Sequence, residues 1–323
     1  MSVPKRYSFT RYLAAKKSVD DRALNRHVWG TLARRLPQAG PEKPLRVLEI
    51  GAGIGTMLER ILDWGLLSYA DYTAIDSQSE NIAHIRQRLP GWAAAHNYIC
   101  REGSSNNWRL VNQAGEVKVC FETCDLFEFI AREEGVRKWD LLLAHAFLDL
   151  MDIPSTLRQL TSLLAPDGLV YFTINFDGAT ILEPEIDPEL DKHIQALYHQ
   201  TMDERITSGK PSGDSQAGRH LFEHLRLTGL QILDAGASDW VVFPNTQGYP
   251  GDEAYFLHFI IHTIQQTLAG HPHLDSRRFT DWVNERHAQV ERGELVYIAH
   301  QLDFLGKVSE HFFIQENYSA KTT

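Results

Sequence analysis

The sequence predicts an α/β fold in which parallel strands alternate with helices, and three observations lead to this prediction. Runs of aliphatic residues such as Leu45–Ile50 have the composition of buried strands. Segments with the apolar spacing of helices follow these runs, as at residues 57–66. Three glycines, Gly51, Gly53 and Gly55, separate the first strand from the first such helix. With 323 residues, 43% of them hydrophobic, the chain can bury a sizeable core and has length left for additions.

The glycine turn after the first strand indicates a nucleotide-binding loop. Glycine permits positive φ and lets a ligand approach bare backbone beside the unpaired N–H groups of the following helix. A dinucleotide fingerprint, G-x-G-x-x-G, needs a glycine where Thr56 stands, so a pyrophosphate ligand is disfavoured. Glu49 agrees, because a carboxylate beside the loop repels phosphates and suits a cationic ligand. A turn that binds nothing is the alternative, although three glycines cost backbone entropy.

Acidic residues follow the second and third expected strands. Residues 71–75 form the second strand, which ends at Asp76, and residues 117–122 form the third, which is followed by Asp125. An acid at the tip of a parallel strand is placed to accept hydrogen bonds from a nucleoside. Each Asp is equally suited to cap the helix that follows it, so the two interpretations stay open.

The fourth expected strand, residues 139–144, is followed by His145. Histidine is the natural base near neutral pH, and a packed histidine at a strand end is the alternative. Asp149 is interpreted as a helix cap or a surface charge before a helix at residues 155–164. A turn at residues 164–168 then leads into a fifth strand at residues 169–175.

The series Glu49, Gly51, Gly53 and Gly55 resembles the first motif, E-x-G-x-G-x-G, of the class I S-adenosylmethionine-dependent methyltransferases. The resemblance extends over residues 45–175. It implies a three-layer, Rossmann-like fold with a seven-stranded, mostly parallel sheet, helices on both faces and S-adenosyl-L-methionine as cofactor. The two further strands that it requires are expected at residues 230–242 and 295–305, the last of them antiparallel.

The resemblance also implies roles for individual residues. In this family the glycine loop lies under the methionine part of the cofactor, the acid after the second strand binds the ribose, and the acid after the third strand accepts a hydrogen bond from the adenine amino group. The cofactor-binding residues are therefore expected to be Glu49, Gly51, Ala52, Gly53, Gly55, Asp76, Ser77, Asp125, Leu126 and His145. His145 is also the single candidate for a catalytic base.

The remaining segments are expected to determine the substrate. Residues 1–44 are interpreted as a cap of N-terminal helices and a linker, with helical periodicity over residues 7–33. Residues 45–323 are interpreted as the methyltransferase domain, with insertions at about 176–218 and 250–292. The first insertion, a helix at residues 188–206 with a Gly/Ser-rich segment at 208–215, suggests a lid. The second contains helices at residues 253–268 and 276–292. Substrate contacts are expected from Arg11, Tyr12, Arg219 and His220, for which ordinary surface positions are the alternative.

Composition excludes several classes of function. The net charge of −10 and the absence of a basic stripe with interleaved aromatic residues argue against nucleic acid as a partner. The three cysteines lack C-x-x-C spacing, which argues against a zinc site or disulfide framework and fits the cytoplasm. His258 and His262 are four residues apart but lack a third ligand, so no metal site is predicted. No segment has the length of a membrane span.

Taken together, these features predict methyl transfer from S-adenosyl-L-methionine to a small-molecule acceptor. Transfer from a sulfonium is an in-line displacement at an activated methyl group, so the protein mainly has to align the reactants. A non-catalytic cofactor-binding module is the first alternative, and an aminopropyl transferase of the same fold is the second. Association as a homodimer is left open. The acceptor pocket is expected to be aromatic and to draw on Trp240, Phe243, Tyr249 and Tyr255, with core packing as the alternative.

Overall fold

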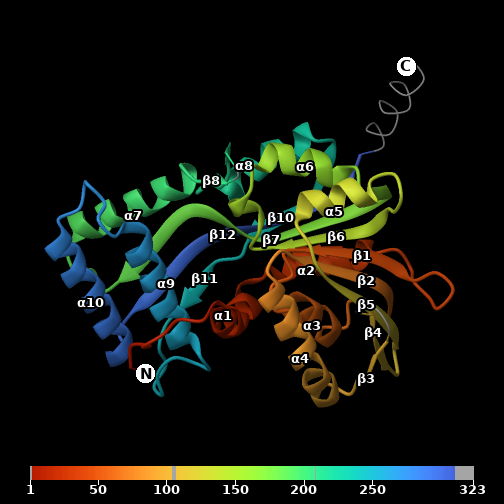
Figure 1. Cartoon of the computed structure of the whole chain (residues 1–323), viewed down its shortest axis with the longest axis horizontal. Helices are drawn as coiled ribbons and strands as arrows, with labels where there is room; N and C mark the ends of the chain where they lie inside the picture. The colour runs from red at the N-terminus through yellow and green to blue at the C-terminus, as the bar shows by residue number, and fades with distance from the viewer. Residues whose placement is uncertain (1, 104–106, 208, 310–323) are drawn as a thin grey trace.

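The central element of the fold is one large twisted sheet with helices on both faces (Figure 1). The computed structural model describes residues 2–103, 107–207 and 209–309. Within these ranges the sheet has ten strands, in the order β10-β12-β7-β6-β1-β2-β5-β4-β3, with β11 beside β12. The expectation of a mostly parallel, three-layer α/β fold is confirmed, but the expected number of seven strands is wrong.

The five central strands are parallel and lie close to their expected positions. Each pairs with its neighbours in parallel register, and the first of them has side chains at Val47, Leu48 and Ile50 that are fully buried. Burial on both faces explains the near-continuous apolar runs in the sequence. The strands are β1 (Leu45–Ile50), β2 (Tyr69–Asp76), β5 (Gly115–Thr123), β6 (Trp139–His145) and β7 (Leu164–Glu183).

The C-terminal strands complete the sheet beside β7. β12 (Val296–Val308) runs antiparallel to β7, as expected for the last strand, and β10 (Leu230–Ala237) runs antiparallel to β12. The single strand expected at residues 230–242 is interrupted at Ser238 and Asp239, where the N–H of Gln301 donates to the Asp239 side chain although the N–H of Ser238 still donates to the carbonyl of Gln301. The chain then returns to β12 as the short strand β11 (Trp240–Val242).

A hairpin extends the opposite edge of the sheet beyond β5. It consists of β3 (Ile99–Glu102) and β4 (Asn107–Asn112), and β4 pairs antiparallel with β5. The Asn112 side chain accepts hydrogen bonds from the N–H groups of Ala114 and Gly115, which closes the turn into β5. Together with β11, these two strands account for the difference from seven.

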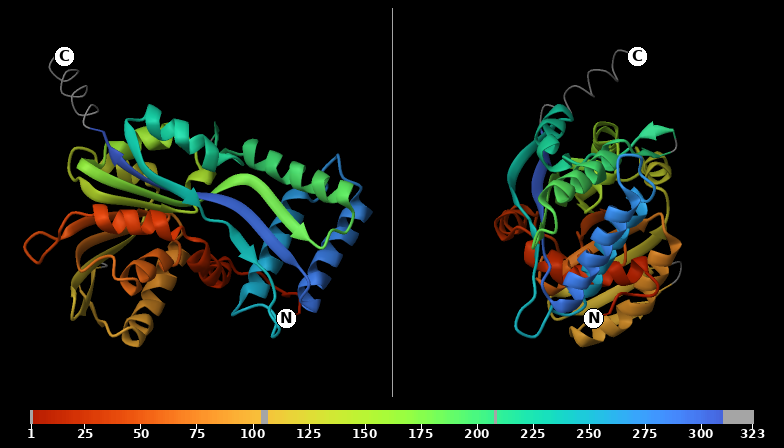
Figure 2. Two further views of the ribbon diagram at one scale, coloured as in Figure 1. Left: turned by 180° about the vertical axis from the view of Figure 1, so that it is seen from behind. Right: turned by 90° about the vertical axis from the view of Figure 1, so that its left-hand side faces the viewer.

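Helices cover the two faces of the sheet in separate groups (Figures 1 and 2). One group packs with the core residues Leu32, Met57 and Ile85, and the other packs with Phe129, Leu157 and Leu221. The first group is α2 (Arg26–Arg35), α3 (Thr56–Asp63) and α4 (Ser79–Ala95). The second is α5 (Leu126–Glu133), α6 (Ile153–Thr161) and α8 (Ala217–Leu227), with the short 3₁₀ helix η1 (Leu148–Leu150) before α6.

The N-terminal cap consists of two helices, and the helical periodicity over residues 7–33 is interrupted between them. α1 (Phe9–Ala23) ends before Asn25, and α2 begins directly after it. The Asn25 side chain caps α2 by accepting hydrogen bonds from the N–H groups of His27 and Val28, and its own N–H donates to Asp303. Asparagine is favoured at such N-caps, which explains why the helix restarts at this position.

Strands β7 and β12 continue well beyond the rest of the sheet (Figure 2, left). They stay paired as far as Glu183 and Val296, so the first expected insertion begins as strand, and the turn expected at residues 164–168 lies inside β7. Three helices surround this extension together with α1: α7 (Pro188–Asp203), α9 (Glu253–Leu268) and α10 (Ser276–Arg292). The helices expected in the second insertion are confirmed, whereas the helix expected to reach residue 206 ends at Asp203.

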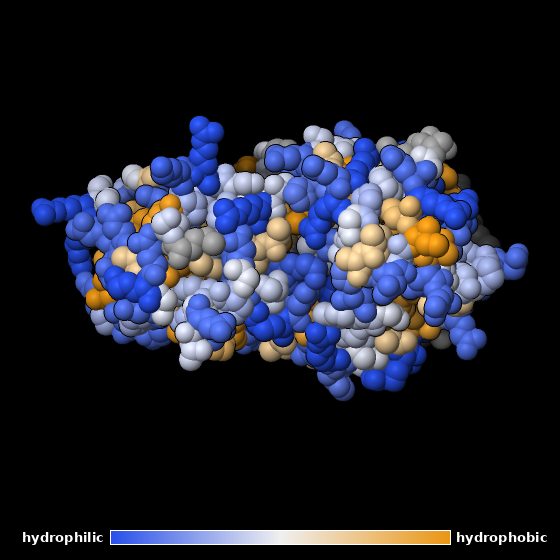
Figure 3. All heavy atoms as spheres, turned by 90° about the horizontal axis from the view of Figure 1, so that it is seen from below, coloured by the Kyte–Doolittle hydropathy of each residue, from blue (hydrophilic) through white to orange (hydrophobic). Residues whose placement is uncertain are grey.

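The segment after α7 forms a small hairpin of β8 (Ile206–Thr207) and β9 (Lys210–Pro211). Ser208, the first residue of the segment expected to be flexible, lies outside the described residues. None of the helices in the described ranges is long and apolar enough to cross a bilayer. Seen from below, the surface is mostly hydrophilic, and its hydrophobic side chains form separate spots (Figure 3).

Candidate functional site

The loop after β1 adopts a backbone that suits glycine. Gly51, Gly53 and Gly55 have φ values of +63°, +54° and +79°, which side-chain-bearing residues rarely adopt. A Cβ atom at Gly51 would lie 2.4 Å from the ring of Phe147. The N–H of Ala52 donates to the carbonyl of Ile75, so the loop is attached to the end of β2. The glycines therefore permit both the turn and the close approach of Phe147.

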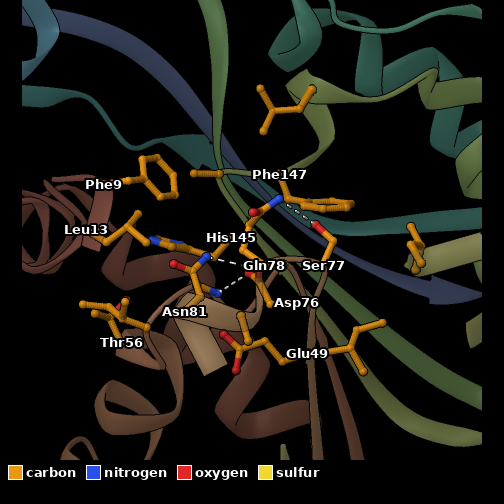
Figure 4. Close-up of a pocket in the computed structure, with 18 of the residues that line it drawn as sticks. Phe9, Leu13, Glu49, Thr56, Asp76, Ser77, Gln78, Asn81, His145 and Phe147 are labelled. Carbon is orange, nitrogen blue, oxygen red and sulfur yellow. Dashed lines mark hydrogen bonds between the residues drawn. The ribbon is translucent and has the colours of Figure 1, made fainter. Parts of the chain in front are cut away.

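Asp76 joins this loop to the start of α4 (Figure 4). Its Oδ2 accepts a hydrogen bond from the N–H of Gly53 at 2.8 Å, and its Oδ1 accepts from the N–H of Gln78 at 2.8 Å and from Asn81 Nδ2 at 3.1 Å. Gln78 is the N-cap residue of α4, so the interpretation of Asp76 as that cap is wrong. The carboxylate instead holds the glycine loop in place, and Oδ2, which accepts a single hydrogen bond, retains acceptor capacity for a ligand.

Glu49 is a buried carboxyl at the end of β1, with 1% of its surface exposed. The Tyr72 hydroxyl donates to Glu49 Oε2 at 2.7 Å. Burial raises the pKa of Glu49 to about 8, although the hydrogen bond from Tyr72 and the charge of Arg60 oppose the shift. Glu49 is therefore mostly protonated at neutral pH, and a cation placed beside it would favour the charged form.

Asp125 is the N-cap of α5, as the structural interpretation of this residue predicted. Its Oδ1 accepts hydrogen bonds from the N–H groups of Phe127 at 2.8 Å and Glu128 at 3.3 Å. One carboxylate oxygen is left without a capping role, and the residue is exposed at the mouth of a cavity. The neighbouring Leu126 lines the same cavity and is itself almost fully buried. Capping therefore leaves Asp125 able to contact a ligand.

Both ring nitrogens of His145 are engaged within the protein. Nδ1 lies 2.7 Å from Thr173 Oγ1, and Nε2 lies 2.9 Å from Asp20 Oδ2. Because a carboxylate only accepts hydrogen bonds, Nε2 carries the proton and Nδ1 accepts from the Thr173 hydroxyl. Burial lowers the pKa of His145 to about 4, even though Asp20 opposes the shift. These contacts fit the alternative of a packed histidine and leave neither nitrogen free to take a proton.

The predicted cofactor residues surround one cavity of about 280 Å³ at the carboxyl ends of β1, β2, β5 and β6 (Figure 4). All of them line it except Gly55, which is the last glycine of the loop and the N-cap residue of α3. Helix α1 closes the cavity from the other side with Phe9, Leu13 and Lys16. The sequence did not identify these three residues, although their spacing places them on one side of α1.

Lys16 is the most informative of these additions. It is 6% exposed and its Nζ lies 3.2 Å from Asp20 Oδ2, the carboxylate that also accepts from His145. Lys16 lines the first cavity and also a second one beside it. A buried cation therefore stands between the two cavities.

The second cavity, of about 320 Å³, lies between α1, α9, the end of α7 and the extension of β7 and β12. It shares Phe9, Leu13, Lys16, Ala146 and Leu150 with the first cavity. Its walls are largely aromatic and are formed by Tyr12, Phe176, Tyr198, Trp240, Phe259 and Tyr297. The two cavities thus adjoin along α1 and the segment after β6.

Two residues with unusual backbone geometry line the cavities: Ala146 lies at their junction, and Ile174 lines the second cavity alone. Ala146 and Ile174 have φ values of +50° and +58°, a conformation that is strained for a β-branched residue such as Ile174. The N–H of Ile174 donates to Asp303 Oδ1 at 2.8 Å, and the N–H of Ala146 donates to the carbonyl of Thr173. Such strain commonly marks functional sites, and here it occurs at residues that line the cavities.

The residues predicted to contact substrate are not brought together. Tyr12 lines the second cavity and stacks on Phe259, with ring centroids 4.2 Å apart. Arg11 binds Asp252 and lies over the ring of Tyr255. The other two predicted residues are on α8, where Arg219 binds Asp177 at 2.8 Å and His220 lies 2.7 Å from Asp214. Neither lines the first or second cavity.

The aromatic residues expected in the acceptor pocket also separate. Trp240 lines the second cavity, and its Nε1 donates to Asp20. Phe243 is 53% exposed, the Tyr249 hydroxyl donates to the carbonyl of Leu295, and the Tyr255 hydroxyl donates to that of Ser8. Their helical or strand spacing gave no information on which of them would face a cavity.

The region of His258 and His262 has no metal-binding arrangement among the residues described. His258 Nδ1 lies 2.9 Å from His287 Nδ1, whereas His262 stacks on Tyr7. Within residues 2–103, 107–207 and 209–309, no three or more His, Cys, Asp or Glu side chains are grouped so that they could hold a metal ion.

A family model described as a methyltransferase domain matches residues 24–207. Solved structures with a similar fold include a putative sarcosine dimethylglycine methyltransferase from Galdieria sulphuraria, at 13% identity and a TM-score of 0.41 over 96% of this chain and 93% of that one. A S-adenosylmethionine-dependent methyltransferase from Thiobacillus denitrificans, in complex with S-adenosyl-L-homocysteine, has 14% identity and a TM-score of 0.41 over 94% and 99%. The cyclopropane synthase MmaA2 from Mycobacterium tuberculosis has 10% identity and a TM-score of 0.44 over 94% and 100%. No curated protein matches the sequence.

Proposed function

The chain belongs to the methyltransferase family, as a class I enzyme that depends on S-adenosyl-L-methionine, and we propose that it methylates a small molecule by in-line displacement. The observation that carries this proposal is the pair of adjoining cavities. The first is lined by nearly all residues of the expected cofactor site, and the second has several aromatic residues in its walls.

The first cavity is the proposed cofactor site. The glycine loop would lie under the methionine part, and Asp76 would accept hydrogen bonds from the ribose hydroxyls. Asp125 would accept from the adenine amino group beside Leu126. The fixed position of Asp76 supports this arrangement, because its bonds to Gly53 and Asn81 already orient the carboxylate. Ala52 and Ser77 complete the site from the same two loops.

Opposite charges are available at the methionine end of the cofactor. Glu49 is placed to stabilise the cationic ammonium and sulfonium, since burial makes its carboxylate responsive to a nearby cation. Lys16 lines the same cavity and is the proposed partner of the cofactor carboxylate. Arg11, which the sequence suggested as a substrate contact on the same helix, has its guanidinium bound to Asp252.

The junction of the cavities is the proposed place of reaction. The methyl group would point from the first cavity past Ala146 into the second, where the acceptor would approach opposite to sulfur. His145 is proposed as a positioning residue and not as the base, because its two nitrogens hold Thr173 and Asp20. A cavity of about 320 Å³ with aromatic walls favours a small acceptor over a macromolecule.

Composition supports the remaining parts of the proposal. The net charge of −10 disfavours nucleic acid as the acceptor. Cys100, Cys120 and Cys124 are free thiols, which is typical of the cytoplasm.

Equilibrium binding of S-adenosyl-L-homocysteine, measured by calorimetry, tests the proposal. The wild-type protein should bind it, Asp76→Ala should bind about tenfold or more weakly, and Asp71→Ala, at the other end of the same strand, should bind normally. Absence of binding by the wild-type protein would refute the proposal. Binding without transfer of a labelled methyl group to any of a broad acceptor panel would favour a non-catalytic module.

A further inference from the structure

The second cavity, which we call the acceptor chamber, contains polar groups that indicate which chemical groups the acceptor carries. This inference rests on the proposed function, because it takes the chamber as the place of the methyl acceptor. Three groups carry it: Asp149 after β6, Gln301 on β12, and Arg205 after α7. They come from distant parts of the chain and line one cavity.

Two hydrogen-bond acceptors in the chamber lack donors. Asp149 Oδ1 and Gln301 Oε1 are buried and have no hydrogen-bond partner among the residues that the structure describes. Gln301 is 2% exposed, so solvent does not replace the missing donor. A buried polar atom without a partner costs free energy, because it has lost its hydrogen bonds to water. A ligand that brings N–H or O–H groups would remove this cost.

Asp149 has the properties of a proton acceptor. The sequence suggested a cap or surface charge, but the residue lies between the cavity-lining residues Ala146 and Leu150. Burial raises the pKa of Asp149 to about 6, and the charge of Asp214 acts in the same direction. The positive charges of Lys16 and Arg205 oppose this shift. A carboxylate of this kind is present at neutral pH and takes up a proton readily.

Arg205 supplies a positive charge to the acceptor chamber. It is half-buried on the wall of the chamber and forms no ion pair within 4 Å among the described residues. The other cation of the chamber, Lys16, is already paired with Asp20. An unpaired guanidinium in a largely aromatic cavity is suited to a carboxylate, which it can bind through two parallel hydrogen bonds.

The walls between these groups accept a flat apolar body. Tyr12 of α1 stacks on Phe259 of α9. Trp240 of β11 and Tyr297 of β12 add further aromatic surface. Aromatic walls bury a ring or short hydrocarbon chain with little loss of their own conformational entropy.

We propose that the acceptor chamber takes a small carboxylic acid that bears a hydroxyl or amine on an apolar body, with Arg205 binding the carboxylate and Asp149 and Gln301 accepting from the nucleophilic group. In the reaction the bond between sulfur and the methyl carbon breaks and its electron pair stays on sulfur. The acceptor oxygen or nitrogen forms the new bond to that carbon. Its proton passes to the Asp149 carboxylate and then to water, so that charge balances.

Matched probes test this assignment on the full chain saturated with S-adenosyl-L-homocysteine. Each set contains a hydroxy acid, the amide of that acid, and the same acid without its hydroxyl. The sets are built on benzoate, phenylacetate and 3-phenylpropionate, with the hydroxyl at the para position. Calorimetry should show, for at least one length, binding of the hydroxy acid that is tenfold or more tighter than binding of the other two members.

Variants then assign each preference to a residue. Arg205→Met should abolish the preference for acid over amide, and Asp149→Ala should abolish the preference for the hydroxylated acid. Arg226→Met removes an exposed cation on α8 that lines neither cavity, so it should leave both preferences unchanged. Each variant must still bind S-adenosyl-L-homocysteine, which shows that its cofactor site is folded.

Three results would overturn the inference. These are equal binding of acid and amide at every length, retention of the acid preference in Arg205→Met, and failure of all probes to bind a protein that does bind S-adenosyl-L-homocysteine. If S-adenosyl-L-homocysteine itself does not bind, the proposed function fails, and the two failures are thereby distinguished.

Discussion

His145 Nε2 lies 2.9 Å from Asp20 Oδ2, so the end of the central strand β6 is hydrogen-bonded to the N-terminal helix α1. The same carboxylate accepts a hydrogen bond from Trp240 Nε1 at 2.8 Å and forms an ion pair with Lys16 at 3.2 Å. Asp20 is fully buried. One side chain therefore joins α1, β6 and β11 at the boundary of the two cavities.

Removing this carboxylate should destabilise the fold strongly. In Asp20→Ala the ammonium of Lys16 and the indole N–H of Trp240 lose their buried partner, and the loss of one member of a buried pair costs about 3–5 kcal/mol. Urea denaturation should show this decrease in the free energy of unfolding. Asp71→Ala, which removes an exposed partner of Lys118, should change it by less than about 1 kcal/mol. Equal effects of the two substitutions would contradict the role given to Asp20.

The contribution of Asp20 should also depend on pH. Burial alone would raise the pKa of Asp20, but Lys16 and His145 outweigh it and hold the pKa below its ordinary value. A carboxyl whose pKa is lower in the folded state stabilises the fold above its unfolded pKa of about 4, and the stabilisation is lost as the pH falls below that value. The difference in unfolding free energy between wild type and Asp20→Asn should therefore shrink in acid. A constant difference from pH 7 to pH 3 would be the contrary result.

Cofactor binding should release a proton from Glu49. The carboxyl is protonated at pH 7 in the free protein because its pKa is raised to about 8, and a bound cation lowers that pKa. Affinity for S-adenosyl-L-methionine should therefore rise with pH between about 6 and 8, by up to about tenfold per unit. Calorimetry in buffers of different ionisation enthalpy counts the protons.

Two comparisons sharpen this prediction. S-adenosyl-L-homocysteine lacks the sulfonium charge, so it should release fewer protons than S-adenosyl-L-methionine. Glu49→Gln should release none, whereas Glu189→Gln, at an exposed position of α7, should behave as wild type. Heats that are independent of the buffer in the wild-type protein would exclude the proton release.

Gly51 should be less replaceable than Gly65, although both have left-handed backbone, with φ of +63° and +67°. A Cβ atom at Gly65 meets nothing within 4 Å, whereas one at Gly51 meets the ring of Phe147 at 2.4 Å. Gly65→Ala should cost about 1–2 kcal/mol of backbone strain and leave cofactor binding intact. Gly51→Ala should cost more and also weaken binding of S-adenosyl-L-homocysteine.

The double variant Gly51→Ala/Phe147→Ala tests the cause. Removal of the ring should recover part of the stability lost in Gly51→Ala, as measured by thermal unfolding. If the double variant is as unstable as the sum of its single variants, the contact with Phe147 is not the cause.

Serine at position 125 should separate the two roles of Asp125. Serine caps helices about as well as aspartate, so Asp125→Ser should leave stability nearly unchanged, whereas Asp125→Ala should cost about 0.5–2 kcal/mol. Both variants should bind S-adenosyl-L-homocysteine about tenfold or more weakly, because neither can reach the adenine amino group with a carboxylate. Wild-type affinity in Asp125→Ser would restrict the residue to capping.

Local patterns were sufficient to predict the parallel core and the glycine loop. The strand at Leu45–Ile50 is buried on both faces, so its sequence is mostly apolar, and the positive φ values of the loop favour glycine. Residues such as Asp76 and Ser77 follow strand ends of the same sheet, and the topology brings them to one edge. Features that depend on neighbours in sequence were therefore accessible before the structure.

Features that depend on distant partners were not accessible. Arg11 and Lys16 lie on the same helix, and only tertiary packing assigns Arg11 to Asp252 and Lys16 to the cavities. The division of the N-terminal helix at Asn25 depends on Asp303, nearly the whole chain away. The β3–β4 hairpin did leave a local signal, since Trp108 and Leu110 alternate with exposed residues, as expected for a strand with one buried face.

The length of β7 has a consequence for the length of the acceptor. Thr173 on this strand holds His145 at the cofactor side, while Phe176 and Thr180, further along the same strand, line the acceptor chamber. The ladder to β12 shifts its register between Phe172 and Asn175 and again between Phe176 and Thr180, so the strand is irregular over this interval. On the proposed function, the course of β7 beyond Thr173 limits how far an acceptor extends from the junction of the two cavities.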